Sequence, residues 1–206
     1  VAAVDAPLVL TPERVAEQLL ARVFGKAHAA PFLATESFLA GFNGLAGPNL
    51  MRELRSRDFV HGLPDAAQPR VAVEVYPHAA HVSLFGLSER IRFKKGRVDA
   101  RRRLLRIYQL HLAALISRQW PTELLDEPHI AATLDPAAVE VKGRALKALE
   151  DKLDAVTCTY TAWHLKRFQT KGTLPFGDPL TGLIAVPRWP DSASELLAST
   201  RWRSHA

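Results

Sequence analysis

Two aspartates three residues apart, Asp151 and Asp154, are the residues whose type and spacing most directly suggest chemistry. Side chains three positions apart on a helix point in similar directions, so the two carboxylates would lie side by side. Like charges repel there unless a cation lies between them, and Mg²⁺ or Mn²⁺ prefers oxygen ligands. Such a site could cleave a phosphodiester bond. Alternatively, the acids form ion pairs with basic neighbours on the same helix, which are Arg144, Lys147 and Lys152.

The helix that carries this pair is expected over residues 136–168. Its apolar residues recur at steps of three and four, which is the pattern of a core-facing stripe. The stripe consists of Leu146, Leu149, Leu153, Val156, Tyr160 and Trp163. At about 100° per residue, both aspartates project away from it. Their own side of the helix changes from charged residues upstream to small and apolar ones such as Ala155 and Cys158 downstream. We therefore expect the acids at the rim of a second packed surface, where the helix meets a sheet.

A basic segment, residues 90–106, is the second candidate for function. It holds a third of the chain's 27 Lys and Arg residues and a single acid, Asp99. The basic residues are Arg90, Arg92, Lys94, Lys95, Arg97, Arg101, Arg102, Arg103 and Arg106. Such a cluster could contact the phosphates of a nucleic acid, or it could be the solvated start of a helix. The net charge of +6 permits a polyanionic partner without requiring one.

The elements that must position these residues alternate between strand and helix signals. Apolar runs predict strands at residues 1–5, 70–77 and 182–187, and the first of them ends at Asp5. Helices are expected over residues 11–24, where Thr11 and Pro12 form an opening signal, around residues 50–54, and over residues 99–118. This alternation is typical of a layered α/β fold. No internal repeat or domain boundary is visible, and residues 189–206 form a polar tail.

Several function classes lack support in the sequence. No apolar run approaches the roughly 18 residues of a membrane span, and no signal-peptide pattern is present. The lone cysteine, Cys158, cannot form an internal disulfide, so we expect a soluble cytoplasmic protein. Phosphate-binding glycine loops and a Gly-x-Ser-x-Gly nucleophile motif are both missing. His78 and His81 follow the strand at 70–77 and could act as a general base or ligand, or be polar residues at a helix start.

Short motifs then follow one another along most of the chain. They are Val-Asp-Ala-Pro-Leu (4–8), Arg14 and Glu17 spaced as R-x-x-E, Glu-Val-Tyr-Pro-His-Ala-Ala (74–80), the Leu-Phe-Gly-Leu segment with Lys-Lys-Gly-Arg-Val (84–98), Glu-Asp-x-x-Asp-Ala (150–155) and Gly-x-Ile-x-Val-Pro (182–187). In this order they resemble an uncharacterised bacterial family of predicted nucleases with an RNase H-like fold. The resemblance implies a single RNase H-like domain over residues 1–188, with a mixed sheet flanked by helices.

The resemblance also implies roles for individual residues. Asp5 matches the acid of the fourth strand in the resolvase branch of that superfamily, and Asp151 and Asp154 match the acidic pair of its closing helix. Glu74 lies in a strand particular to this family and is a fourth candidate catalytic residue. Together these acids would hold Mg²⁺ or Mn²⁺. The residues expected to contact nucleic acid are Lys94, Lys95, Arg97, Arg101, Arg102 and Arg14, although Arg14 could instead pair with Glu17.

The chain departs from the family pattern at its beginning. Members of the family start with a Gly-x-Asp-like strand and a hairpin, which have no counterpart here. We therefore expect a sheet that lacks its N-terminal strands, a site without the first-strand acid, and weak metal binding. Two functions stay open. One is a metal-dependent nuclease that hydrolyses phosphodiester bonds, and the other is a non-catalytic nucleic-acid-binding or scaffold protein that kept the fold.

Overall fold

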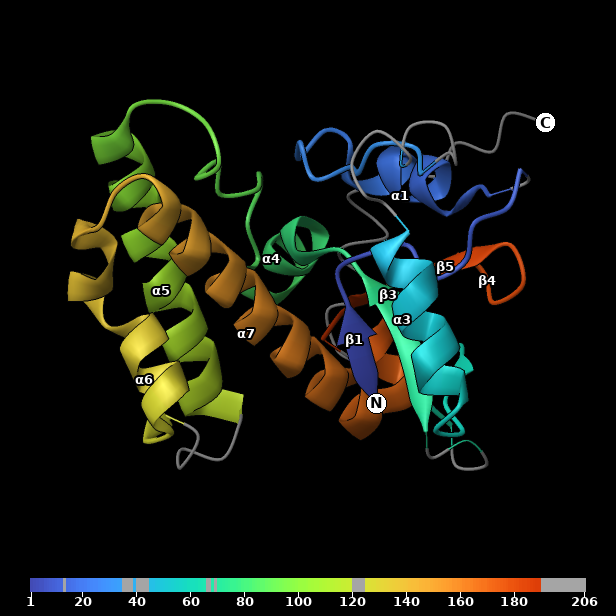
Figure 1. The fold of residues 1–206 in the computed structure, drawn as a ribbon. Coiled ribbons are helices and arrows are strands. Elements are labelled where there is room, and N and C mark those ends of the chain that lie inside the picture. The colour runs from blue at the N-terminus through green and yellow to red at the C-terminus, as the bar shows by residue number, and fades with distance from the viewer. Residues whose placement is uncertain are drawn as a thin grey trace.

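The computed structural model of the protein describes residues 1–12, 14–34, 39, 45–65, 68, 70–119 and 125–189. In these residues a mixed sheet of five strands is flanked by six α-helices (Figure 1). The α/β class predicted from the alternating signals is confirmed, and the arrangement is compatible with an RNase H-like fold. Among the described helices, none is both long and apolar enough to cross a membrane. Apart from residue 189, the expected polar tail lies outside the described residues.

The strands follow the order β1, β3, β5, β4, with β2 beside the start of β3. Their bounds are β1 Ala2–Val4, β2 Val60–His61, β3 Val71–Val75, β4 Thr173–Asp178 and β5 Gly182–Pro187. β1, β2 and β5 run parallel to β3, whereas β4 is antiparallel to β5. Val4 lies opposite Glu74 in the register of β1 and β3. The three strands predicted from apolar runs, at residues 1–5, 70–77 and 182–187, therefore lie in one sheet.

The two faces of the sheet carry different helices. The α-helices are α1 Ala16–Phe24, α3 Ala46–Arg55, α4 Pro77–Phe85, α5 Val98–Gln119, α6 Pro128–Leu134 and α7 Arg144–Phe168. Successive side chains of a strand point to opposite faces. On one face Val73 packs with Cys158 of α7. On the other face Ala72 packs beside α3, and Ile184 packs with Leu20 of α1. All of β3 is buried, as its apolar run predicts.

A second core lies beside the sheet, between α7 and the helices α4, α5 and α6 (Figure 1). The predicted apolar stripe of the long helix faces this core. Leu146, Leu153 and Tyr160 are completely buried there, and Leu149 nearly so. Because α7 also packs on β1 and β5, it is shared by both cores. The position of α7 therefore determines how close Asp151 and Asp154 lie to the end of β1.

Two helices begin later than the sequence signals suggest. α1 starts at Ala16 rather than at residue 11, because the side chain of Arg14 turns into the core to meet Glu74. The long helix starts at Arg144 rather than at residue 136. Gly143 adopts a φ of 60° before it, and Pro136–Glu140 form a separate 3-10 helix. The Asp135 side chain opens that 3-10 helix by accepting a hydrogen bond from the Ala137 N–H at 2.8 Å.

Three of the described elements were not predicted, namely α6, β2 and β4, and α4 was indicated only by the interpretation of His78 and His81 as residues at a helix start. α4 is buried along nearly its whole length, so its residues show no alternation between an apolar and a polar face. β2 has only two residues, and β4 contains a proline and a glycine, which are typical of turns. α6 has only seven residues, which is too short for a helical period to be recognised in the sequence. Tertiary packing rather than local pattern stabilises these elements.

Candidate functional site

Asp5 and Asp154 lie close enough for their charges to repel each other, where the end of β1 packs against α7. Asp5 directly follows β1, and a hydrogen bond links its backbone to the thiol of Cys158, one turn beyond Asp154. Asp154 is buried, although its neighbour Asp151 one turn earlier is exposed and pairs with Lys147. The predicted change from charged, exposed residues to small, buried ones on this side of the helix therefore falls between Asp151 and Asp154. Asp154 belongs to the site, and Asp151 lies on its solvent side.

The charges of the two carboxylates are crowded. Asp5 remains exposed on one side, yet the loss of hydration and the repulsion by Asp154 raise the pKa of its carboxyl to about 6. Burial also raises the pKa of Asp154, against the opposing attraction of Lys94. Asp151 adds further negative charge to both groups. The site therefore has a high affinity for protons or for another cation.

Lys94 is the cation that the chain itself supplies. It lies between α4 and α5, and its Nζ is 2.8 Å from Oδ2 of Asp154. The ammonium group also attracts the charge of Asp5. With 39% of its side chain exposed, Lys94 can leave Asp154 for a ligand without opening the core. If Lys94 contacts nucleic acid as predicted, it must first give up its ion pair with Asp154.

Tyr108 of α5 holds Asp154 from the buried side. Its hydroxyl lies 2.6 Å from Oγ1 of Thr157, 3.0 Å from the carbonyl oxygen of Leu153 and 3.3 Å from Oδ1 of Asp154. The single hydroxyl proton of Tyr108 can be donated to any of these three oxygens, and Thr157 can in turn donate its own proton to the tyrosine oxygen. Tyr108 is not among the candidate functional residues of the sequence analysis. The available signal was a hydroxyl-bearing side chain in an otherwise aliphatic stripe, since buried tyrosines usually pair their hydroxyl.

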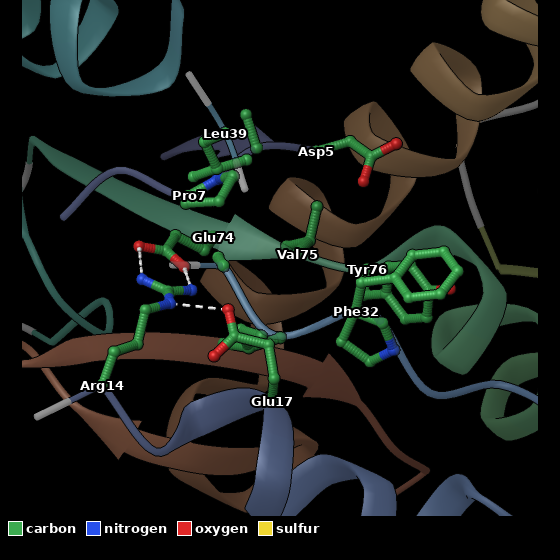
Figure 2. A pocket seen from close by; sticks show the side chains of 13 residues that line it. Asp5, Pro7, Arg14, Glu17, Phe32, Leu39, Glu74, Val75 and Tyr76 are labelled. Carbon is green, nitrogen blue, oxygen red and sulfur yellow. Dashed lines mark hydrogen bonds and ion pairs between the residues drawn. The ribbon is translucent and has the colours of Figure 1, made fainter. Parts of the chain in front are cut away.

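Glu74 does not join this pair. It is buried on the other side of β3, where it receives the guanidinium of Arg14 and the backbone N–H of Leu8 at 2.7 Å. Arg14 in turn donates to Glu17 at 2.5 Å. Figure 2 shows this network and the side chain of Asp5 pointing away from it. Glu74 and Arg14 therefore hold the turn after Asp5 in place, and neither is free for a metal ion or a phosphate.

The remaining basic candidates divide into two groups. Arg101 of α5 pairs with Glu150 of α7 at 2.5 Å, and Arg102 of α5 donates to the carbonyl oxygen of Val141 in the loop before α7 at 3.0 Å, so both residues form contacts within the protein. Lys95 and Arg97 are exposed on the loop before α5. With Lys94 they form the part of the predicted phosphate-binding surface that lies next to Asp154.

The two histidines lie beneath the site rather than in it. His81 is completely buried, and its ring centroid is 4.2 Å from that of Tyr108. Burial and the nearby charge of Lys94 lower the pKa of His78 to about 3. Neutral, buried rings of this kind form an aromatic base for Tyr108 and Lys94. His78 does lie in the first turn of α4, as one of the two open interpretations suggested, but both rings are buried there rather than solvated.

The oxygen donors suit a hard divalent cation. Within the described residues, no group of three or more His, Cys, Asp or Glu side chains could hold a metal ion. Mg²⁺, however, is commonly bound through one or two carboxylates, with water and substrate phosphates as its other ligands. Asp5 and Asp154 meet that requirement as a pair. The expectation of four protein ligands is not met, because Glu74 lies in a separate network and Asp151 faces solvent.

Comparison with known proteins adds a family. No curated protein and no solved structure matches the chain. A family model described as "Protein of unknown function (DUF429)" matches residues 1–179, a range that includes β1, α7 and the site between them. Because this match spans most of the sequence, the chain belongs to the DUF429 family, whose function is unknown.

Proposed function

We propose that this protein is a phosphodiesterase that depends on Mg²⁺ or Mn²⁺, acts on nucleic acid, and uses Asp5 and Asp154 as its metal ligands. The observation that carries the proposal is the convergence of these two carboxylates beside Lys94. Both carboxyls have raised pKa values, first because burial removes their hydration and then because neighbouring carboxylates repel them. Perturbed acids beside a basic surface are typical of functional sites.

The residues around the pair have separate roles in this proposal. A divalent ion held there would activate a water molecule and stabilise the charge that develops on the phosphate. Tyr108 keeps Asp154 in one orientation. Lys94 neutralises Asp154 in the free protein and turns to a phosphate oxygen when substrate is present. Lys95 and Arg97, which are exposed beside it, hold the neighbouring phosphates of the strand.

The experiment that tests the proposal measures cleavage of end-labelled single-stranded DNA, single-stranded RNA and branched DNA in Mg²⁺, Mn²⁺ or EDTA. Asp154→Asn, which keeps the shape of the side chain and removes its charge, should reduce cleavage to the background rate. Asp58→Asn is a matched control, because the side chain of Asp58 is 90% exposed and distant in the fold from the site. Cleavage that persists in EDTA or in the Asp154 variant would refute the proposal.

One observation favours a second candidate, a nucleic-acid-binding protein without catalysis. Lys94 already forms an ion pair with Asp154 at 2.8 Å, and no group of three or more His, Cys, Asp or Glu side chains among the described residues could hold a metal ion. Such a protein would bind nucleic acid in a strongly salt-dependent way and cleave none of the substrates in either metal. Its binding would also be unchanged or tighter in Asp154→Asn, since that variant removes a negative charge next to the phosphates.

A further inference from the structure

Arg90 lies in the loop between α4 and α5 and differs from the other basic residues of the segment 90–106. It is half-buried, and no acid among the described residues forms an ion pair with it. The other half-buried arginines of this segment each pair with an acid, namely Arg101, Arg102 and Arg106. A charged group that is partly dehydrated and has no counter-ion is costly. Arg90 is therefore a cation that lacks a partner within the described part of the chain.

The accessible end of the Arg90 side chain is its pair of terminal nitrogens. Nε is buried without a hydrogen-bond partner, so it is out of reach of a ligand. Nη1 and Nη2 are not among the buried, unpartnered side-chain atoms of the described residues. The N–H groups at the tip of a guanidinium match the spacing of two oxygens on one phosphate. Arg90 therefore presents an anion-binding fork whose inner edge is enclosed by the protein.

Arg90 lies beside Tyr76, the residue between β3 and α4. The Arg90 backbone N–H donates to the carbonyl oxygen of Ala27 at 2.9 Å, and the Tyr76 hydroxyl donates to that of Ala30 at 3.3 Å. Both residues thus hold the same short loop after α1. Burial raises the pKa of the Tyr76 hydroxyl, and the charge of Arg90 opposes that rise. The guanidinium of Arg90 is therefore close to the Tyr76 side chain.

Tyr76 in turn borders the candidate phosphodiesterase site. It lines the same cavity as Asp5, and the charges of Asp5 and Asp154 also act on its hydroxyl (Figure 2). A row of neighbouring rings connects it to the lysine that pairs with Asp154. The ring centroid of His78 is 5.5 Å from that of Tyr76 and 5.6 Å from that of Phe93, and Nζ of Lys94 lies 5.6 Å from the Phe93 centroid. Two cations of one loop therefore border the acid pair, Lys94 at Asp154 and Arg90 beyond Tyr76.

We propose that Arg90 binds a phosphate of the nucleic-acid strand close to the cleaved bond, with Nη1 and Nη2 donating to its oxygens. Lys94, Lys95 and Arg97 follow Arg90 in the same loop and lead towards α5. Arg90 contacts the loop after α1 instead, so it extends the phosphate-binding surface to the α1 side of the acid pair. A carboxylate would also fit the fork, but a run of cations along one loop favours a chain of phosphates. This inference rests on the proposed function, because it takes nucleic acid as the ligand.

The test measures binding of an end-labelled single-stranded DNA oligonucleotide in EDTA, from about 50 to 200 mM salt. Arg90→Met keeps an unbranched stem and removes the charge. It should weaken binding about tenfold, because one charge-assisted contact is lost, and lower the slope of log K against log salt by about 1. Its urea midpoint should equal or exceed that of wild type, because no described acid loses its counter-ion. Unchanged affinity and slope, or a lower urea midpoint, would overturn the inference.

Two further variants separate a specific contact from a general effect of charge. Arg92→Met is the matched control, because it makes the same change two residues away, at a side chain that is 54% exposed and pairs with Glu89 at 2.8 Å. It should bind DNA nearly as wild type does, and a loss equal to that of Arg90→Met would overturn the assignment to Arg90. Arg90→Lys keeps the charge without the fork, so it should restore the salt slope and only part of the affinity.

Cleavage of oligonucleotides that carry one uncharged methylphosphonate linkage then locates the contact. In wild type this linkage should slow cleavage of a bond at one fixed distance along the strand, and Arg90→Met should abolish that dependence. A pattern that is the same in both proteins would overturn the inference.

The outcomes distinguish this inference from the proposed nuclease activity. Weaker binding by Arg90→Met, with no cleavage of any substrate by wild type, would support the Arg90 contact while the proposed phosphodiesterase fails. Metal-dependent cleavage by wild type, with unchanged binding by Arg90→Met, would overturn the Arg90 contact alone.

Discussion

Replacement of Asp5 by asparagine is expected to stabilise the protein at neutral pH. The pKa of the Asp5 carboxyl is raised from 3.8 to about 6, first by loss of hydration and then by the charge of Asp154. The folded protein therefore holds this proton more tightly than the unfolded chain does. Stability falls as the pH rises from about 4 to 6, because the unfolded chain ionises first. Above about pH 6 the full destabilisation by ionised Asp5 is present, and Asp5→Asn removes it.

The magnitude follows from the rise in pKa. A rise from 3.8 to about 6 corresponds to about 3 kcal/mol for a group fully shielded from solvent. Asp5 is exposed on one side, so solvent screens much of the repulsion, and we expect a gain of about 1 kcal/mol at pH 7.5. The gain should shrink towards zero near pH 4, where Asp5 is protonated in the folded protein.

The measurement is urea denaturation of the wild-type protein and Asp5→Asn at pH 7.5, 6, 5 and 4. Asp58→Asn serves as the control, because it makes the same chemical change at a side chain that is 90% exposed and pairs with Arg70 rather than with the site. Added Mg²⁺ should stabilise the wild-type protein more than Asp5→Asn. A variant that is less stable than wild type at pH 7.5, or a difference that does not change with pH, would refute the crowding of Asp5 and Asp154.

Three other changes probe the surroundings of the site. Arg14→Met should lower the free energy of unfolding by about 3–5 kcal/mol, because it leaves Glu74 buried without a cation; a urea midpoint close to that of wild type would contradict this. Tyr108→Phe should cost about 1 kcal/mol of stability and slow cleavage, and normal cleavage would show that the hydroxyl does not orient the acid. In Lys95→Ala/Arg97→Ala, binding of single-stranded DNA should weaken, and the slope of log K against log salt should fall by about 2; an unchanged slope would place both residues outside the interface.

Local pattern was sufficient for the elements with a strong period or a long apolar run. Apolar residues recur every three or four positions along α7, and this spacing alone indicates which side of the helix is buried. That side carries Leu146 and Leu153. Val71–Val75 reads as a strand covered on both faces because nearly every residue in it is apolar. The same helical spacing placed Asp154 at the edge of a second packed surface. The motif resemblance, rather than spacing, connected it with Asp5.

The roles of the polar residues inside the fold could not be read from such patterns. An acid in a buried strand can bind a metal ion or pair with a base, and Glu74 pairs with Arg14, which lies 60 residues earlier in the chain. Because Arg14 turns into the core, α1 begins at Ala16, although the opening signal of Thr11 and Pro12 predicts an earlier start. Tyr108 and Asp154 are separated by 46 residues and meet only because α5 and α7 share a core.

The sequence by itself thus determined which segments are buried and which residues could carry charge to a site, because burial and charge are properties of each side chain and its close neighbours along the chain. Only the tertiary structure decided which acids meet. Electrostatic interactions act over a few ångströms in space, and the packing of α7 against β1 brings Asp154 towards Asp5 while β3 carries Glu74 to the opposite face.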